Sequence, residues 1–123
     1  ERLKKLLHSH NRHLNGAKIL IVGAAYKKDV KDLRESPAIE IIETLQARGV
    51  NVSFYDPFLP YLKIHEIDLK RIEISSKSLK TFDCVIIVTD HTKVDYSFIK
   101  KHAKLIFDTR NVYKQGGKNI IRL

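Results

Sequence analysis

The sequence has no methionine, no tryptophan and only one cysteine, Cys84. A single cysteine excludes a disulfide within the chain, which favours a reducing compartment, and we therefore expect a cytoplasmic protein. No run of about 18 apolar residues and no charged-then-apolar leader is present, so neither a transmembrane helix nor a secretory signal is predicted. Because no methionine opens the chain and it starts with ERLKKLLHSHNRHLNG, we expect it to be part of a longer protein.

Acidic residues are the scarcer charge. The chain has 23 Lys and Arg against 14 Asp and Glu, a net charge of +9. This balance favours anionic partners such as nucleic acid, phosphorylated metabolites or acidic surfaces. The basic residues are scattered along the chain, which argues against a basic arm for nucleic acid, and many of them fit a solvated face. The length of 123 residues, 43% of them hydrophobic, suits one globular domain with a single core.

Apolar runs alternate with helical patterns, which predicts an α/β fold: a Rossmann-like three-layer sandwich with a mostly parallel sheet. The run 18–23 suits a strand buried on both faces, and Ser36-Pro37 predicts the start of a helix that ends at Gly49. Further strands are expected at 50–55, 83–89, 104–107 and, at an edge, 119–123, with helices at 75–81 and at 93–102, the last capped by 90–92. Segment 57–82 is ambiguous, with 71–74 as a candidate short strand. Residues 1–16 are expected to be the end of a linker helix, and 17–123 the domain.

The first turn lacks the glycines of a dinucleotide-binding fold. That motif reads G-x-G-x-x-G, whereas this chain has Gly23 alone in GAAYKK. The acid after the second strand, Asp56, lies 33 positions beyond Gly23 (56 − 23), and the motif expects a gap of about 20. The strand-helix order is that of a dinucleotide domain, but the sequence does not favour an NAD site in this segment.

The same turn offers side chains for an anionic ligand. Tyr26 can stack on a base or sugar or donate a hydrogen bond, and Lys27 and Lys28 can offset phosphate charge. Arg110 follows another strand end and can form a forked contact with phosphate or with a pair of hydroxyls. These residues are the candidate wall of a binding site at the carboxyl ends of the strands.

Other polar residues near the same loops have competing interpretations. Asp108 either orients the Arg110 guanidinium or joins an ion-pair network with Asp32, Arg34 and Glu35, and that trio fits loop bracing better than ligand contact.

Two residues with reactive side chains lie on or just after a predicted buried strand. His91 is a candidate general base, although capping and packing are favoured. Cys84 lies inside the strand, and a buried thiol is inert. Three histidines in 1–14 lack a carboxylate partner and do not favour a metal site.

Four segments, in order, resemble the carboxyl-terminal UDP-binding domain of the UDP-glucose/GDP-mannose dehydrogenase family. They are GAAYKKDVKDLRESP at 23–37, RGVNVSFYDP at 48–57, VIIVTDH at 85–91 and FDTRN at 107–111. The segment AYKKDV is most similar to the corresponding segment of members that oxidise UDP-N-acetylhexosamines at C6. The resemblance runs from about Lys18 to the end of the chain.

This resemblance implies a fold, a ligand and a division of labour. Full-length members bind NAD in an amino-terminal domain, dimerise through a central helix and close the UDP-sugar between the end domains. A cysteine elsewhere carries the two-step oxidation of C6, which consumes two NAD and serves polysaccharide biosynthesis. Tyr26, Lys27 and Arg110 match family positions that face the UDP-sugar. The nucleophile and NAD motifs have no counterpart here, so this segment is expected to bind UDP-sugar without catalysis, and neither nucleic acid nor membrane is an expected partner.

Two other functions remain open from the residues alone. A basic α/β module for nucleotides or nucleic acid would show binding that weakens steeply with salt and does not depend on Tyr26. A regulatory or dimerisation module would show no response to nucleotides and a concentration-dependent mass.

Overall fold

The computed structural model of the chain describes residues 14–25, 27–29, 33 and 36–123. The elements are β1 (Lys18–Val22), α2 (Pro37–Ala47), β2 (Asn51–Tyr55), β3 (Tyr61–Ile64), β4 (Ile67–Lys70), α3 (Ser76–Thr81), β5 (Cys84–Ile87), α4 (Tyr96–His102), β6 (Ile106–Asp108) and β7 (Ile120–Arg122). Within the described ranges, no helix combines the length and apolar content needed to cross a membrane.

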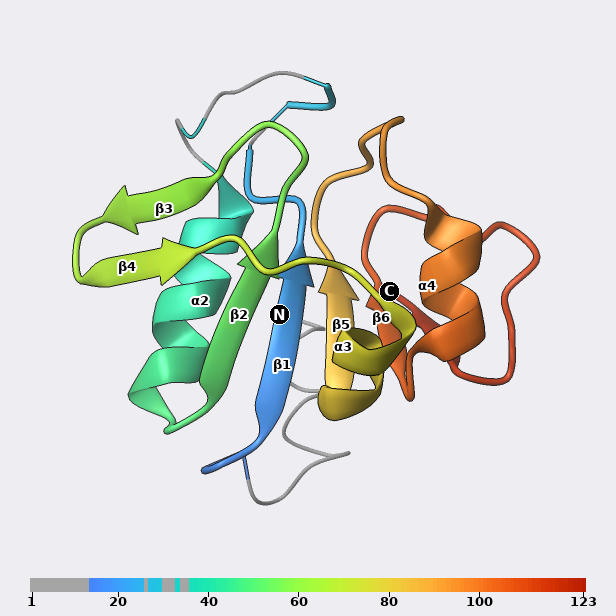
Figure 1. The fold of residues 1–123 in the computed structure, drawn as a ribbon, viewed down its shortest axis with the longest axis horizontal. Helices are drawn as coiled ribbons and strands as arrows, with labels where there is room; N and C mark the ends of the chain where they lie inside the picture. The colour runs from blue at the N-terminus through green and yellow to red at the C-terminus, as the bar shows by residue number, and fades with distance from the viewer. Residues whose placement is uncertain (1–13, 26, 30–32, 34–35) are drawn as a thin grey trace.

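The main sheet has five parallel strands in the order β2-β1-β5-β6-β7. The chain runs from β1 to β2 on one side and later crosses to β5 on the other side of β1. The strand order therefore reverses between β1 and β5, which is where an open α/β sheet places its ligand crevice. The Rossmann-like fold predicted from the sequence is confirmed (Figure 1).

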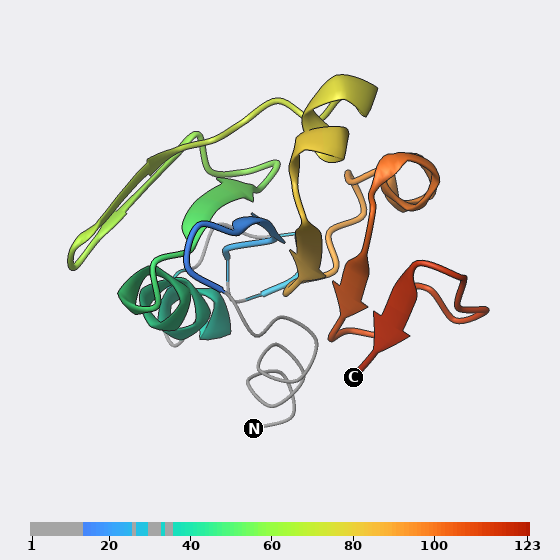
Figure 2. The ribbon, with the colours of Figure 1, turned by 90° about the horizontal axis from the view of Figure 1, so that it is seen from below.

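Helices cover both faces of this sheet, as the view along its edge shows (Figure 2). Side chains of β1 alternate between two apolar clusters: Ile19 and Ile21 pack on the α2 side, and Leu20 and Val22 pack on the side of α3 and α4. The four are at most 1% exposed. The expectation of a strand buried on both faces is thus confirmed, and the sheet forms a rigid support for the loops at its ends.

The two ends of α2 follow local signals. Ser36 Oγ accepts a hydrogen bond from the Ala38 N–H, and Pro37 fills the first helical position, where no N–H partner is needed. Ser75 likewise caps α3, and its side chain and that of Ser78 bond each other's backbone N–H. Both helices therefore begin where the sequence predicts.

Two expectations about elements were wrong. Helix α4 begins at Tyr96 with Asp95 as its cap, not at 93 with 90–92 as the cap, because residues 90–92 bond the loop after β1 instead. Residues 71–74 form no strand. The strands of the ambiguous segment are β3 and β4, which form an antiparallel hairpin next to β2 (Figure 1). Leu62 and Ile67 of this hairpin belong to the same apolar cluster as the buried side chains of α2.

The expected linker helix falls almost entirely outside the described residues, which begin at Leu14. Leu14 itself is buried against the α2-side cluster. The Gly16 N–H donates to the Gly49 carbonyl, which ties the entry of the chain to the turn after α2.

Candidate functional site at the carboxyl edge of the sheet

Because the five strands are parallel, the loops that follow β1, β2, β5 and β6 leave from one edge of the sheet. In Figure 1 the arrowheads of β1, β2 and β5 point to this edge. It is the edge at which the sequence places Tyr26, Lys27 and Arg110.

The centre of this edge is occupied by the Asp56 carboxylate, which has no solvent exposure. Its Oδ2 accepts hydrogen bonds from the N–H groups of Ala24, at 2.8 Å, and Ala25, at 3.0 Å, and its Oδ1 accepts from Phe58 N–H at 2.8 Å. In a dinucleotide-binding fold, the N–H groups of this first turn face the pyrophosphate. Here the Asp56 carboxylate already accepts the N–H groups of Ala24 and Ala25.

Gly23 allows the first turn to lie directly on the loop after β5. Its φ is +89°, and a Cβ at this position would stand 2.6 Å from the Thr89 carbonyl oxygen. The Thr89 hydroxyl in turn donates to the Ala25 carbonyl at 2.6 Å. The single glycine of the turn therefore serves contact between two loops and not the approach of a ligand.

His91 is fully buried between these loops. Its Nδ1 accepts the Asp29 N–H at 2.8 Å, so the ring proton belongs on Nε2, which lies 3.1 Å from Asp56 Oδ2. The His91 N–H donates to the Tyr96 hydroxyl, and the ring meets Phe58 edge-on. Both ring nitrogens are engaged within the protein, which fits the packing interpretation and leaves neither nitrogen for a general base.

The Tyr96 hydroxyl completes this interior. Burial raises its pKa well above the usual range, which keeps the proton available for donation to the Thr89 carbonyl at 3.2 Å. In the described part of the chain, every buried side-chain nitrogen and oxygen has a hydrogen-bond partner. The buried polar side chains at this edge are therefore all satisfied by hydrogen bonds within the protein.

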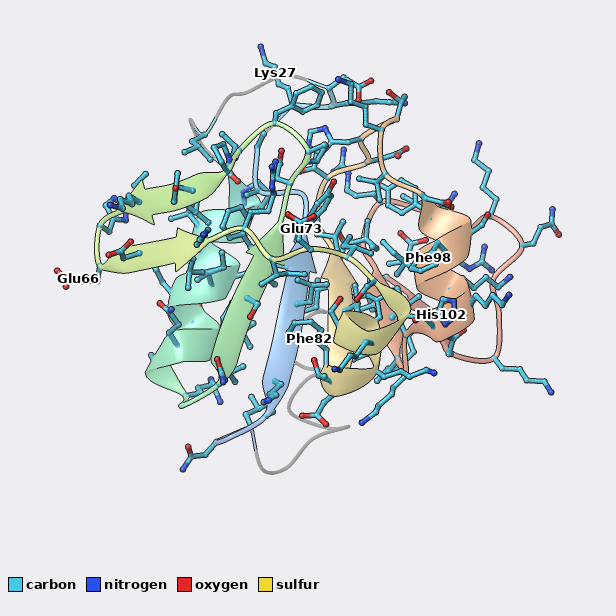
Figure 3. All side chains as sticks on the ribbon, viewed as in Figure 1. Lys27, Glu66, Glu73, Phe82, Phe98 and His102 are labelled. Carbon is cyan, nitrogen blue, oxygen red and sulfur yellow. The ribbon has the colours of Figure 1, made fainter. Side chains whose placement is uncertain are left out.

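Lys27 lies outside this closed interior. It is exposed and projects away from the body of the protein (Figure 3). Lys28 lies 3.9 Å from the Asp90 carboxylate, and the Asp29 carboxylate accepts from Thr92 N–H at 2.7 Å. This bond from Thr92 lowers the pKa of Asp29 below its ordinary value. Tyr26 lies outside the described residues, as do Asp32, Arg34 and Glu35 with their expected bracing role.

Arg110 is exposed in the turn after β6. The buried Asp108 carboxylate accepts the backbone N–H groups of Arg110, Val112 and Tyr113, at 2.8 to 3.1 Å. The interpretation that Asp108 orients the guanidinium was therefore wrong: it holds the backbone of the turn. Asn111, at φ +57°, completes a conformation that Asn tolerates better than most residues.

The sheet brings Lys27 and Arg110 to the same edge. Only β5 lies between β1 and β6, and neighbouring strands are spaced at about 4.8 Å, so the two strand ends stand about 10 Å apart. Lys27 and Arg110 are thus exposed cations on loops that leave the same edge of the sheet, with β5 between their strands.

Chemical machinery is not found among the described residues. No cluster of His, Cys, Asp and Glu there has the geometry of a metal site. Burial raises the pKa of the Cys84 thiol to about 12, so this cysteine is no nucleophile. Sequence reasoning missed the central role of Asp56, since its partners at the first turn and at His91 lie 31 to 35 residues away.

Comparison with known proteins identifies the family. The family model for the UDP-glucose/GDP-mannose dehydrogenase family, UDP binding domain, matches residues 20–115. The chain belongs to this family. The match runs from within β1 to the turn after β6 and includes both candidate cations.

Relatives within the UDP-glucose/GDP-mannose dehydrogenase family agree. A UDP-N-acetyl-D-mannosamine dehydrogenase of Methanococcus vannielii is 33% identical over 110 residues, which cover 83% of this chain and 24% of the relative. A UDP-glucose 6-dehydrogenase of Rhizobium meliloti is 25% identical over 130 residues, covering 91% of this chain and 27% of the relative. The chain thus spans about a quarter of the length of the curated relatives it matches.

Solved structures of the family share the fold. The UDP-N-acetylmannosamine dehydrogenase of Pyrococcus horikoshii superposes with a TM-score of 0.71 at 28% identity, over 98% of this chain and 28% of the other. The UDP-N-acetyl-mannosamine dehydrogenase Cap5O of S. aureus gives a TM-score of 0.69 at 28% identity, over 98% of this chain and 29% of the other.

Proposed function

We propose that this chain is the UDP-sugar-binding domain of a nucleotide-sugar 6-dehydrogenase and that it binds UDP through Tyr26, Lys27 and Arg110. The observation that carries the proposal is the use of the first-turn N–H groups by Asp56. Since the Ala24 and Ala25 N–H groups are bonded within the protein, we expect side chains to contribute the anion contacts at this edge. Lys27 and Arg110 are exposed cations on the loops that flank β5.

Each of the three residues has a distinct chemical part. The Lys27 ammonium is a compact charge that offsets the diphosphate, and the Arg110 guanidinium makes forked contacts with phosphate or with two hydroxyls. Tyr26 supplies a ring face for the base or sugar, or a hydroxyl donor. Family membership supports UDP as the nucleotide.

We infer that catalysis belongs to the parent enzyme and not to this chain. Oxidation of C6 to a carboxylate removes four electrons and needs NAD twice, yet the first turn here does not fit NAD. Cys84, the only cysteine, is buried. The parent would bind NAD in another domain, act as a homodimer through its central helix and supply a uronic acid for polysaccharide synthesis.

Calorimetric titration of the chain with UDP tests the proposal. We expect a dissociation constant of millimolar or better, weakened about tenfold by Lys27→Ala and by Arg110→Ala, because each removes a charge-assisted contact. Lys104→Ala and Arg48→Ala are matched controls, since both residues are exposed and lie away from the loops of the carboxyl edge.

Three outcomes would contradict the proposal. The first is the absence of UDP binding by the natural sequence, and the second is an equal loss of affinity in the control variants. The third is tighter binding to oligonucleotides than to UDP with a steep salt dependence, which would favour the nucleic-acid function instead.

A further inference from the structure

The loop that carries Lys27 is attached to the loop after β5 by a set of contacts that we call the His91 clasp. It consists of Asp29, Asp56, His91 and Thr92. His91 Nδ1 accepts the Asp29 N–H at 2.8 Å, and the Asp29 carboxylate accepts both the N–H of Thr92, at 2.7 Å, and its hydroxyl, at 3.1 Å. These contacts lie two residues from Lys27 in the sequence.

The two sides of the imidazole face different environments. On the Nε2 side, Asp56 is fully buried and is already fixed by the backbone of the first turn and of Phe58. On the Nδ1 side, Asp29 is only partly buried and belongs to the loop that leads out to Lys27. The His91 ring therefore connects the buried Asp56 carboxylate to the loop that carries Lys27.

The backbone of the outer loop has an uncommon conformation at this point. Asp29 has a φ of +60°, in the left-handed region that non-glycine residues rarely adopt. Such a conformation persists when surrounding contacts determine it. The bond to His91 and the two bonds to Thr92 are those contacts. The clasp therefore fixes the backbone two residues after Lys27 and so sets the direction of the loop at Lys27.

We propose that His91 is a positioning residue for UDP binding. By accepting the Asp29 N–H at Nδ1, it fixes the loop so that Lys27 stands at the anion site before the ligand arrives. The proposal rests on the proposed function, because it assigns a purpose to the position of Lys27. A fixed loop lowers the entropy that binding must otherwise pay to order it.

Two substitutions separate the two sides of the ring. In His91→Asn, the amide oxygen can occupy the place of Nδ1 and still accept the Asp29 N–H, while the donor to Asp56 is lost. In His91→Gln, the amide nitrogen can occupy the place of Nε2 and still donate to Asp56, while the acceptor for Asp29 is lost. Both variants lose the ring and its contact with Phe58, and they differ in size by one methylene group.

The experiment measures UDP affinity and amide hydrogen exchange of the full chain for both variants. We expect His91→Asn to keep UDP affinity within about threefold of the natural sequence and to keep the Asp29 amide protected. We expect His91→Gln to weaken UDP binding about tenfold and to speed exchange at Asp29 at least tenfold. Equal affinities in the two variants, or an affinity order opposite to this one, would overturn the proposal, because a purely structural histidine predicts no such division.

A measurement on the natural sequence guards against a variant that fails to fold. An N–H···N hydrogen bond transmits a scalar coupling between its two nitrogens, here the Asp29 amide nitrogen and His91 Nδ1. We expect this coupling in the free chain and again at saturation with UDP; its absence from either state refutes a preset loop. If UDP does not bind although the coupling and the exchange pattern are as expected, the proposed function fails and the clasp remains a fixture of the loop.

Discussion

Replacing Gly23 by alanine tests how closely the first turn lies on the loop after β5. The new methyl group would meet the Thr89 backbone, 2.6 Å from its carbonyl oxygen and 2.8 Å from its nitrogen. Backbone atoms cannot rotate away, so the loops must separate, at about 1–3 kcal/mol for overpacking. The φ of +89° adds about 1–2 kcal/mol for a side chain in this region. We therefore expect a loss of about 2–5 kcal/mol in the free energy of unfolding.

Gly16 provides the control for this prediction. Its φ is +87°, nearly the same as at Gly23, but a Cβ there has no neighbour within 4 Å. Gly16→Ala therefore carries the conformational cost of about 1–2 kcal/mol without the steric one. The difference between the two variants isolates the contact between the loops.

Urea unfolding followed by circular dichroism measures both variants. We expect the midpoint to fall for each, and further for Gly23→Ala, with an unchanged slope if both states keep their exposed surface. If the two variants lose the same free energy to within about 0.5 kcal/mol, the close approach to Thr89 contributes nothing and the reasoning about this edge is refuted.

Three further predictions concern the polar and reactive groups. Burial raises the pKa of Cys84 to about 12, so its thiol should resist iodoacetamide at pH 8 until the protein unfolds; labelling at the rate of a free thiol would contradict this. The Asp29 carboxyl should have a pKa below 3.8 in an NMR titration, because Thr92 donates to the carboxylate. The stabilisation from this contact is complete above the ordinary pKa and is lost as the pH falls through the lowered pKa. A measured pKa at or above 3.8 would show that the bond is absent. Asp56→Asn should lose about 2 kcal/mol in urea unfolding, since the new NH2 group must face an N–H donor, and a loss under 0.5 kcal/mol would show that the carboxylate does not hold the turn.

The parts of the fold that could be predicted from the sequence are those with local causes. The four-residue apolar core of β1 and the Ser36-Pro37 start of α2 carry their own signals, and the structure has both elements where these signals place them. The alternation of such elements was enough to predict a parallel sheet with helices on both faces.

The errors arose where side chains bond across the chain and not along it. Residues 90–92 have the composition of a helix cap, yet Thr92 bonds Asp29 across 63 residues, and Asp95 caps α4 instead. The hairpin β3–β4 was missed because its short strands pair only with each other and owe their place to the core contacts of Leu62 and Ile67. Both features do leave local traces, because Leu62, Ile64, Ile67 and Leu69 alternate with polar residues around a two-residue turn and Asp is a common N-cap residue. These short patterns compete with equally good alternatives nearby, and the contacts across the chain decide between them.

The candidate site divides in the same way. Lys27 and Arg110 could be named because each follows a strand end in a recognisable motif, and their roles at UDP remain predictions. Asp56 looked like a misplaced ribose-binding acid because its spacing was wrong for that role. Only the three-dimensional contacts assign it to the amides of the first turn.

The Asp56 carboxylate acts as a built-in substitute for a phosphate. Its Oδ2 accepts the N–H groups of Ala24 and Ala25, while its Oδ1 accepts the Phe58 N–H. A phosphate that approached these two first-turn amides would have to displace a side chain that belongs to the protein. A side chain bound permanently to the amides that would face a diphosphate is thus one way for a protein of this fold to distinguish UDP from NAD. Engineering this sheet to accept NAD would have to start with that carboxylate, before any glycine is added.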